Sequence, residues 1–478
     1  MGSFCFFDLE TFGTVAGRDR VAQFAVQRTN AALEPMGPPV VEYCQPSAWP
    51  LPEPDACLVT GITPQIAQDR GLPEWRFCEQ LLAALAGPDT CIVGYNSSHF
   101  DDTFVQHLCW RNFHDPYAWH WQDGNSRWDV LTLARAAFAL RPDGVSWPQH
   151  ADGTQSLKLE DLARANALPQ PQAHDALGDV TATLALAQLL RERQPRLFDY
   201  ALSLRDKRVV AEMIQPGEPL AHVSGKVRAQ WRCLTLWLPV CPHPDNRNEW
   251  LGLDLRGPLA PWMELSPEEL AERIFTAQDD LPEEIERPRM KNLAINRAPF
   301  LADARLITAD VAERAHLDVV AAQEQAAVLR DNLAPLAEKL QAIMALRPEF
   351  ATRDVEARLY DGFVPDADRR RAEAVRAAPM EDLAQFAGQF VDPRLEELLL
   401  RFRARHAPDT LTEAERAEWQ KESRRQLEFA PHGGLTLEQY FQRLQVRARE
   451  VPEAQRELLR QLWRWGQEQA SALGIALE

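Results

Sequence analysis

The 478-residue sequence lacks the features that mark several classes of protein. No stretch approaches the roughly 18 to 20 consecutive apolar residues of a membrane-spanning helix, and no basic segment precedes the apolar run at residues 4–7, so neither a membrane anchor nor a signal peptide is expected. The eight cysteines are scattered, without a Cys-x-x-Cys pair or a neighbouring His-x-x-x-His, which argues against a disulfide framework and a zinc site. We therefore expect a cytoplasmic protein whose cysteines are reduced and lie mostly in the core.

Basic residues are in the minority, because 52 Lys and Arg face 70 Asp and Glu and give a net charge of −18. On average this argues against a polyanionic partner such as a nucleic acid, since phosphate binding depends on Lys and Arg. The average hides local variation, because a basic groove can coexist with an acidic exterior, and a site for divalent cations needs local carboxylates. The net charge therefore excludes no partner by itself.

The chain is long enough, and at 45% hydrophobic residues apolar enough, to bury a sizeable core and to form roughly two to four domains. Residues 4–192 alternate short strand-like runs with helical patterns, which is typical of an α/β domain. The order β-β-β-α-β-α, closed by a helix with an apolar stripe, favours a mixed sheet like that of ribonuclease H. The elements we expect are strands at 4–9, 23–28, 40–44 and 91–95 and a helix at 176–193.

The rest of the chain has a different character. Residues 193–348 contain two runs of alternating large apolar residues, at 231–240 and 250–255, around a turn-rich loop, which predicts antiparallel strands in a small barrel or sandwich. A helical stretch follows at 311–344, and residues 349–478 are helical almost throughout, with helices expected at 393–406, 413–428 and 452–473. We therefore predict an α/β ribonuclease-H-like domain at 4–192, a domain of strands and helices at 193–348 and an all-α domain at 349–478.

Asp8 and Glu10 are separated by one residue on the first predicted strand, so their side chains point to the same face, about 6.5 to 7 Å apart along the chain. Carboxylates so placed can share hard divalent cations such as Mg²⁺. Two such ions about 3.5 to 4 Å apart can activate a water and stabilise the leaving oxygen of a phosphodiester. Asp-x-Glu is also common at strand ends without any catalytic role, so the pair needs partners to carry a function.

Three residues supply such partners. Asp101 follows the predicted strand at 91–95, at the edge where open α/β sheets bind ligands, although a helix N-cap is a simpler role for it. Asp179 lies early in the helix at 176–193, where a rigid backbone can fix a metal ligand. His174 lies on the turn before that helix, and an imidazole with a pKa near 6.5 is neutral often enough at pH 7 to take a proton from a water. A lone histidine in this position is more often structural.

The order Asp-x-Glu, Asn-x₃-Phe-Asp and His-x₄-Asp over about 170 residues resembles the DEDD exonuclease superfamily in its histidine variant. Further stretches, spread over nearly the whole chain, resemble one family within it, that of bacterial exodeoxyribonuclease I. They include residues 12–14, 60–64, 111–113, 115–119, 125–129, 194–200, 222–225, 243–248, 295–296, 359–363 and 366–369. The resemblance implies a 3′→5′ exodeoxyribonuclease that degrades single-stranded DNA processively to 5′-mononucleotides, in DNA repair and recombination.

The resemblance also implies that the middle domain is an SH3-like α+β domain and that the three domains form a C-shaped channel around the DNA. Asp8, Glu10, Asp101 and Asp179 would bind two Mg²⁺ ions, for which Mn²⁺ could substitute; Asp8 would bridge both ions, and His174 would be the general base. The implied DNA contacts are Glu10, Tyr117, Trp121, Arg135, Lys158, Lys207, Asn248, Lys291, Asn296, Tyr360 and Phe363. Lys158 and Gln106 stand where relatives carry arginine, so we expect weaker binding of the DNA phosphates at these two positions.

An aromatic-rich segment supports a nucleic-acid groove independently of the resemblance. Residues 103–141 hold eight aromatic residues, where the chain average of 8% predicts about three in 39 positions, and four arginines are interleaved with them. Aromatic faces stack bases, and arginines hold phosphates. Core packing is the alternative, which we expect for about half of these rings. Tyr117 and Trp121 are preferred as DNA contacts through the resemblance alone.

Two other functions are consistent with parts of the pattern. A 3′→5′ exoribonuclease shares the carboxylates, but such enzymes are usually single compact domains; a catalytically inactive single-strand-binding protein would not need all five active-site residues. The resemblance further implies a monomer that docks the acidic tail of single-stranded-DNA-binding protein on Arg141 and Arg330. Glu218 replaces a lysine near them, so we expect weaker docking, and two solvated surface arginines are the alternative.

Overall fold

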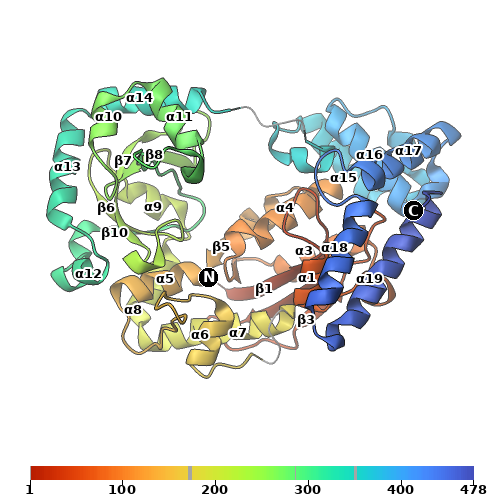
Figure 1. The fold of residues 1–478 in the computed structure, drawn as a ribbon, viewed down its shortest axis with the longest axis horizontal. Helices are drawn as coiled ribbons and strands as arrows, with labels where there is room; N and C mark the ends of the chain where they lie inside the picture. Colours follow the sequence, from red (N-terminus) through yellow and green to blue (C-terminus); the bar gives the residue numbers. More distant parts are fainter. Residues whose placement is uncertain (1, 171–174, 286, 349–352, 478) are drawn as a thin grey trace. The chain divides into compact units, whose positions relative to one another are not determined.

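The structure, a computed structural model, describes residues 2–170, 175–285, 287–348 and 353–477, and the chain forms two compact units (Figure 1). The first unit contains Met1–Asn125, Gln170–Thr181 and Ala351–Glu478, and the second contains Ser126–Pro169 and Ala182–Phe350. Among the described residues, no helix is both long and apolar enough to span a membrane. All eight cysteines are free thiols, and all are buried, which confirms the prediction that they lie mostly in the core.

The first unit is built on a sheet in which the strands follow the order β3-β2-β1-β4. β1 (Ser3–Thr11) pairs antiparallel with β2 (Val21–Thr29) and parallel with β4 (Thr90–Gly94), and β2 pairs antiparallel with β3 (Val40–Tyr43). These bounds differ from the predicted ones by about two residues at most, a normal uncertainty for element ends. The predicted ribonuclease-H-like α/β order is confirmed.

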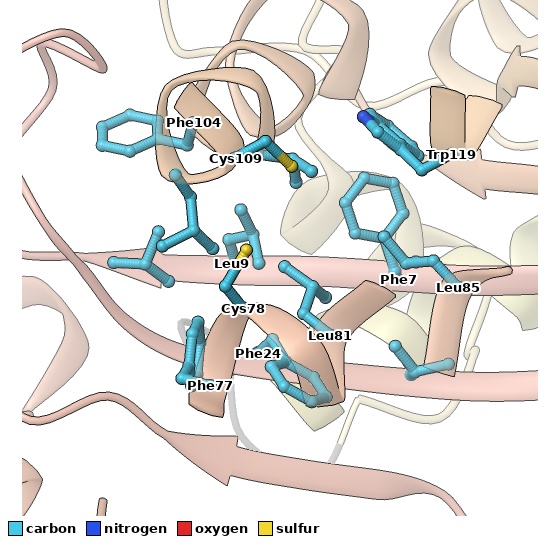
Figure 2. Close-up of a cluster of buried hydrophobic side chains, with 14 of the residues drawn as sticks. Phe7, Leu9, Phe24, Phe77, Cys78, Leu81, Leu85, Phe104, Cys109 and Trp119 are labelled. Carbon is cyan, nitrogen blue, oxygen red and sulfur yellow. The ribbon is translucent and has the colours of Figure 1, made fainter. Parts of the chain in front are cut away.

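Alternation along β1 divides its side chains between two faces of the sheet. Cys5, Phe7 and Leu9 face a hydrophobic core to which α3 (Glu74–Leu85) and α4 (Asp101–Arg111) also contribute. Figure 2 shows Phe7 and Leu9 within this cluster of buried side chains. The helices contribute Phe77, Cys78, Leu81, Leu85, Phe104, Leu108 and Cys109 to this core. Because the odd-numbered positions of β1 fill it, the even-numbered positions point to the opposite face, and Asp8 and Glu10 are two of them.

The C-terminal helices of the first unit share cores with its N-terminal part. α17 (Glu413–Phe429), α18 (Leu437–Glu450) and α19 (Glu453–Ala472) pack with α1 (Pro54–Thr60) and α2 (Pro64–Arg70) around Trp49, Tyr440 and Trp465. The 3-10 turn η7 (Val355–Tyr360), α15 (Asp366–Ala377) and α16 (Pro393–His406) pack around Trp110 and Phe113. The helices predicted at 393–406, 413–428 and 452–473 are confirmed. Capping boxes at Thr412 and Thr436 fix where α17 and α18 begin.

The second unit begins with β5 (Ser126–Asp129) and α5 (Val130–Leu140), followed by α6 (Leu159–Ala165), most of α7 (Ala176–Arg193), α8 (Pro195–Ser203) and α9 (Lys207–Met213). Helix α7 has the predicted bounds, and its apolar stripe is buried. A second sheet follows in the order β10-β6-β7-β8-β9. Its strands are β6 (Leu220–Val223), β7 (Leu234–Pro242), β8 (Glu249–Asp254), β9 (Leu293–Ala294) and β10 (Phe300–Asp303).

The predicted antiparallel pair in this sheet is confirmed, but its start at Trp231 is wrong. Trp231 ends a 3-10 turn, and Arg232 and Cys233 have φ angles of 55° and 57°, so the chain cannot extend into β7 before Leu234. After α10 (Ala260–Glu264) and α11 (Pro267–Phe275), the helical stretch predicted at 311–344 is three helices, α12 (Ala309–Arg314), α13 (Val319–Asp331) and α14 (Leu333–Ala345). The first break follows from the left-handed conformation of His316 and the N-cap at Asp318.

Candidate metal centre

Asp8, Glu10 and Asp179 converge in the first unit. Asp8 and Glu10 lie on the same face of β1, Asp179 lies in the first turn of α7, and one carboxylate oxygen from each lies within 4.8 Å of the other two. No other group of three potential metal ligands is this close among the residues that the structure describes. The predicted convergence of two distant motifs is therefore present in the fold.

Asp101 lies against the segment of β1 between Asp8 and Glu10. It is the first residue of α4, it is 4% exposed, and its Oδ1 accepts a hydrogen bond from the backbone N–H of Leu9 at 3.1 Å. The chain reaches it from β4 through a tight turn in which Gly94 is required, because a Cβ there would lie 2.5 Å from the Ser97 side chain. The N-cap role is wrong for Asp101, since Phe100 is the N-cap residue and the Asp101 carboxylate is turned toward the strand.

Two glutamines support the carboxylates and were missed by the sequence analysis. Gln23 on β2 lies opposite Glu10 in the sheet register, is 1% exposed, and its Oε1 accepts a hydrogen bond from the backbone N–H of Ala176 at 3.3 Å. The Nε2 of Gln170 donates to Oδ1 of Asp179 at 2.9 Å. The first contact ties the start of α7 to the sheet, and the second orients the ligand on that helix. A polar residue at an otherwise apolar position of a buried strand was the available signal for Gln23.

The electrostatics of the cluster are repulsive without a cation. Burial, and then the charges of Asp101, Glu10, Asp179 and Asp175, raise the pKa of Asp8 well above its usual value. Burial, and then Asp179 and the other acids, raise the pKa of Glu10 to about 8. Close carboxylates cannot all be ionised in a poorly hydrated site unless protons or cations neutralise them.

The donor set fits hard divalent cations. It consists of oxygen ligands only, and its carboxylates carry excess negative charge. Among the described residues, the neighbours that shift the pKa of Asp8 and of Glu10 are all acids, and no cationic side chain is one of them. Asp101 adds a fourth carboxylate beside the three. The predicted general base, His174, lies outside the described residues, whereas the neighbouring Asp175 is described and contributes to the field on Asp8.

The aromatic-rich segment divides into buried and exposed rings. Six of its eight aromatic residues are buried, so core packing is the correct interpretation for them; these are Phe104, Trp110, Phe113, Trp119, Trp128 and Phe138. The other two, Tyr117 and Trp121, are 38% and 60% exposed. In the first unit Tyr360 and Phe363 are exposed as well, at 51% and 97%. The four aromatic residues predicted to contact DNA are thus all accessible.

The polar residues predicted to contact DNA in the second unit differ in exposure. Lys158, directly before α6, and Asn296 are exposed, and Arg135 on α5 is half-buried beside Gly225. Lys207 Nζ donates to Asn248 Oδ1 at 3.2 Å. Lys291 is 8% exposed and donates to Ser224 Oγ at 2.9 Å; burial, opposed by Asp254 and reinforced by Lys226, lowers its pKa to about 8.

Sequence models of three domain families match consecutive parts of the chain. The exonuclease family matches residues 5–187, the exonuclease I SH3-like domain matches 205–345, and the exonuclease I C-terminal domain matches 353–469. Exodeoxyribonuclease I of Escherichia coli is 41% identical over 472 residues, which cover 98% of both chains. Exodeoxyribonuclease I of Haemophilus influenzae is 37% identical and covers 97% of this chain and 98% of its own.

Solved structures agree with the sequence relatives. E. coli exonuclease I in complex with a dA16 oligonucleotide superposes with a TM-score of 0.93 at 39% identity, over 98% of this chain and 100% of that one. The zinc-bound form of the E. coli enzyme with single-stranded DNA gives 0.92 at 39%, and a structure of SSB/exonuclease I with the inhibitor CFAM gives 0.90 at 38%, with the same two coverages. The mixed sheet, the SH3-like middle domain and the helical C-terminal domain predicted from the sequence are confirmed. This chain belongs to the exodeoxyribonuclease I family.

Proposed function

We propose that this protein is a 3′→5′ exodeoxyribonuclease that degrades single-stranded DNA processively to 5′-mononucleotides, in DNA repair and recombination. The observation that carries the proposal is the convergence of Asp8, Glu10 and Asp179 within 4.8 Å on an exonuclease domain, with Asp101 beside them. Membership of the exodeoxyribonuclease I family over nearly the whole chain supports DNA, rather than RNA, as the substrate.

Divalent cations belong to this proposal. Asp8, Glu10, Asp101 and Asp179 would hold two Mg²⁺ ions, with Mn²⁺ as a substitute and Asp8 as the shared ligand. When bound, such ions activate a water and stabilise charge on a phosphodiester. Leu9 N–H donates to one oxygen of Asp101, and Gln170 Nε2 donates to one oxygen of Asp179, and these bonds help to orient the two carboxylates. His174 would take the proton of the attacking water, for which a neutral imidazole at pH 7 is suited.

The DNA would be held by stacking and by phosphate contacts. Tyr117, Trp121, Tyr360 and Phe363 are accessible rings that can stack on bases without reading sequence, at about 1–3 kcal/mol per base. The polar contacts of the proposal are Glu10, Arg135, Lys158, Lys207, Asn248, Lys291 and Asn296. Contacts spread along a strand favour processivity, because releasing one of them does not release the DNA.

The acidic tail of single-stranded-DNA-binding protein is the proposed protein partner, with Arg141 and Arg330 as its basic contacts; a related exonuclease I has been solved together with SSB. Arg330 already binds Glu218, with Nη2 and Oε2 3.2 Å apart, and its Nε donates to the backbone carbonyl of Gly217 at 3.0 Å. A carboxylate-rich peptide would have to displace Glu218 to reach the guanidinium group of Arg330. We therefore propose that docking is weak in this protein. Separately, we propose that the enzyme acts as a monomer.

The proposed division into domains is 4–192 for the exonuclease domain, 193–348 for the SH3-like domain and 349–478 for the helical domain. The matched ranges 5–187, 205–345 and 353–469 support it, since the proposed boundaries fall in the gaps between them.

An end-labelled oligonucleotide assay with Mg²⁺ tests the proposal. Wild-type protein and Asp179→Ala are compared on single-stranded DNA, duplex DNA and RNA. The wild type is expected to shorten single-stranded DNA from its 3′ end, with much slower digestion of duplex and RNA, and the variant is expected to be inactive. Equal digestion of RNA and DNA would contradict the substrate class, and activity in the variant would contradict the metal centre.

A further inference from the structure

Tyr360 is held at its hydroxyl by a residue of the helix that carries Asp101. It is the last residue of η7, half of its surface is exposed, and its hydroxyl donates to Gln106 Oε1 at 2.5 Å. Gln106 lies on α4, five residues after Asp101, and is only 9% exposed. A buried amide bonded to an exposed ring can restrain that ring, since the buried partner is itself fixed by the packing of its helix.

A second contact restrains the same ring through its edge. The imidazole of His107, the next residue on α4, stands perpendicular to the Tyr360 ring at 89°, with the ring centroids 5.6 Å apart. His107 is also fixed, because its Nδ1 lies 2.9 Å from the backbone carbonyl oxygen of Glu356. Gln106 and His107 therefore restrain Tyr360 from two directions, while the exposed part of the ring stays accessible.

The start of η7 is anchored by buried charges. The carboxylate of Glu356, 2% exposed, lies 2.6 Å from Arg20 and 3.4 Å from Arg401, and it also binds Arg405. Gly17, three residues before Arg20, packs so closely that a Cβ there would lie 2.8 Å from the Cβ of Ala357. The short turn is thus fixed at its start by Glu356 and at its end by the hydroxyl of Tyr360.

We infer that Gln106 is a positioning residue for the DNA strand: it holds the ring of Tyr360 ready to stack on a base and does not itself take part in hydrolysis. The inference rests on the proposed function, in which Tyr360 contacts single-stranded DNA. Restraining a side chain before binding lowers the entropy lost when the DNA binds. Without the Gln106 hydrogen bond the ring is less restrained, so the affinity for DNA falls while the metal centre is unchanged.

A double-mutant cycle tests the inference. Wild type, Gln106→Ala, Tyr360→Phe and the double variant are compared for the Kd of labelled oligo(dT) in EDTA, and for kcat and KM on single-stranded DNA with Mg²⁺. Each single variant is expected to raise Kd and KM about three- to tenfold, with kcat nearly unchanged. The double variant is expected to match the singles, since both substitutions break one hydrogen bond. Independent, multiplying effects would overturn the inference, as would a wild-type Kd in Gln106→Ala.

Matched controls separate this result from general damage and from failure of the proposed function. Gln455→Ala removes an exposed glutamine on α19, and Tyr440→Phe removes a buried hydroxyl that donates to Leu462 O; neither is expected to change Kd. Tyr360→Ala is expected to raise Kd at least about fivefold, because it removes the stacking face. If Tyr360→Ala weakens binding and Gln106→Ala does not, the inference is wrong and the DNA contact is right. If wild-type protein neither binds nor degrades single-stranded DNA, the proposed function itself is wrong.

Discussion

Two buried groups of acidic side chains in the first unit have opposite electrostatics. In the metal centre, burial and the neighbouring acids raise the pKa of Glu10 to about 8. Around Glu356, burial alone would also raise the pKa, but Arg20, Arg405, Arg401 and Arg111 outweigh it and lower the pKa of this carboxyl well below its usual value. Arg111 and Arg20 likewise lower the pKa of buried Glu74 to about 2 against the effect of burial.

The difference shows how a structural cluster of carboxylates can be told from a ligand site. The Glu356 cluster carries its own counter-charges, so it is complete within the folded chain and links the N-terminal and C-terminal parts of the unit. The Asp8 cluster collects like charges in a buried place, an arrangement that only an external cation or bound protons can stabilise.

Asp8→Asn is expected to have the largest effect, a loss of about 10³-fold or more in kcat on single-stranded DNA. The substitution removes a central carboxylate, and cations that stabilise a phosphodiester contribute several kcal/mol to the rate. The measurement is steady-state hydrolysis of an end-labelled oligonucleotide with Mg²⁺. Glu79→Gln, an exposed acid on α3, is the matched control and is expected to act as wild type. A variant within tenfold of wild type would show that Asp8 is not a required ligand.

Glu356→Gln is expected to lower the free energy of unfolding by about 3–5 kcal/mol, because it leaves buried arginines without their carboxylate. Chemical denaturation in EDTA measures this change in the free energy of unfolding. Because EDTA removes metal from wild type and variant alike, the change cannot arise from metal loss. In the same experiment Asp8→Asn is expected to be as stable as wild type or more stable, since it removes a repelling charge. A destabilised Asp8→Asn together with an unaffected Glu356→Gln would reverse the proposed contrast.

The stability of metal-free protein is expected to fall as pH rises from 6.5 to 8. Glu10 binds a proton more tightly in the folded state, where its pKa is about 8 instead of the ordinary 4.5, so its contribution is complete below pH 4.5 and is lost as pH rises through 8. Glu74, with a pKa of about 2, contributes above pH 4.5 and loses its contribution only as pH falls toward 2. The buried His107, with its pKa lowered to about 4, titrates below this window.

Thermal unfolding with EDTA and with Mg²⁺ measures this pH dependence. Mg²⁺ is expected to flatten the fall in Tm, because the cation replaces the proton on the cluster, and Glu10→Gln is expected to flatten it without metal. An identical slope in wild type and Glu10→Gln would contradict the assignment to Glu10.

Glu218→Gln is expected to have the smallest effect on folding, a change below about 1 kcal/mol. Glu218 and Arg330 are about half exposed, and ion pairs at the surface contribute little. The same substitution is expected to strengthen binding of an acidic, carboxylate-rich peptide, since it removes the carboxylate that competes for the guanidinium group of Arg330. Fluorescence anisotropy with such a peptide measures this, and Glu212→Gln, an exposed acid on α9, is the control. Weaker binding by Glu218→Gln would contradict the proposed competition.

The sequence was sufficient for the parts of the metal centre that local pattern controls. Alternation along β1 placed Asp8 and Glu10 on one face, and the apolar period of α7 gave that helix its bounds and so the position of Asp179. The exposed rings Tyr117 and Trp121 could not be told from buried ones by composition, because burial depends on the packing of distant segments; the resemblance alone pointed to them.

Ion pairs and hydrogen bonds between residues far apart in the chain could not be predicted from the sequence. The partners of Glu356 come from residues 20, 111, 401 and 405, and neither periodicity nor spacing relates these positions. The same holds for the bond from Tyr360 to Gln106, which lies 254 positions away. The N-cap alternative for Asp101 failed for a related reason, since its partner, the N–H of Leu9, lies on strand β1, 92 positions away.

Calorimetric titration of metal-free protein with Mn²⁺ tests most directly whether the Asp8 cluster is a divalent-metal site. The wild type is expected to bind two ions and to release protons at pH 7, because Glu10 is largely protonated there without metal. Repeating the titration in buffers of different ionisation enthalpy counts those protons, and Asp8→Asn is expected to lose binding. Binding that is equal in wild type and Asp8→Asn, or that releases no protons, would contradict the account.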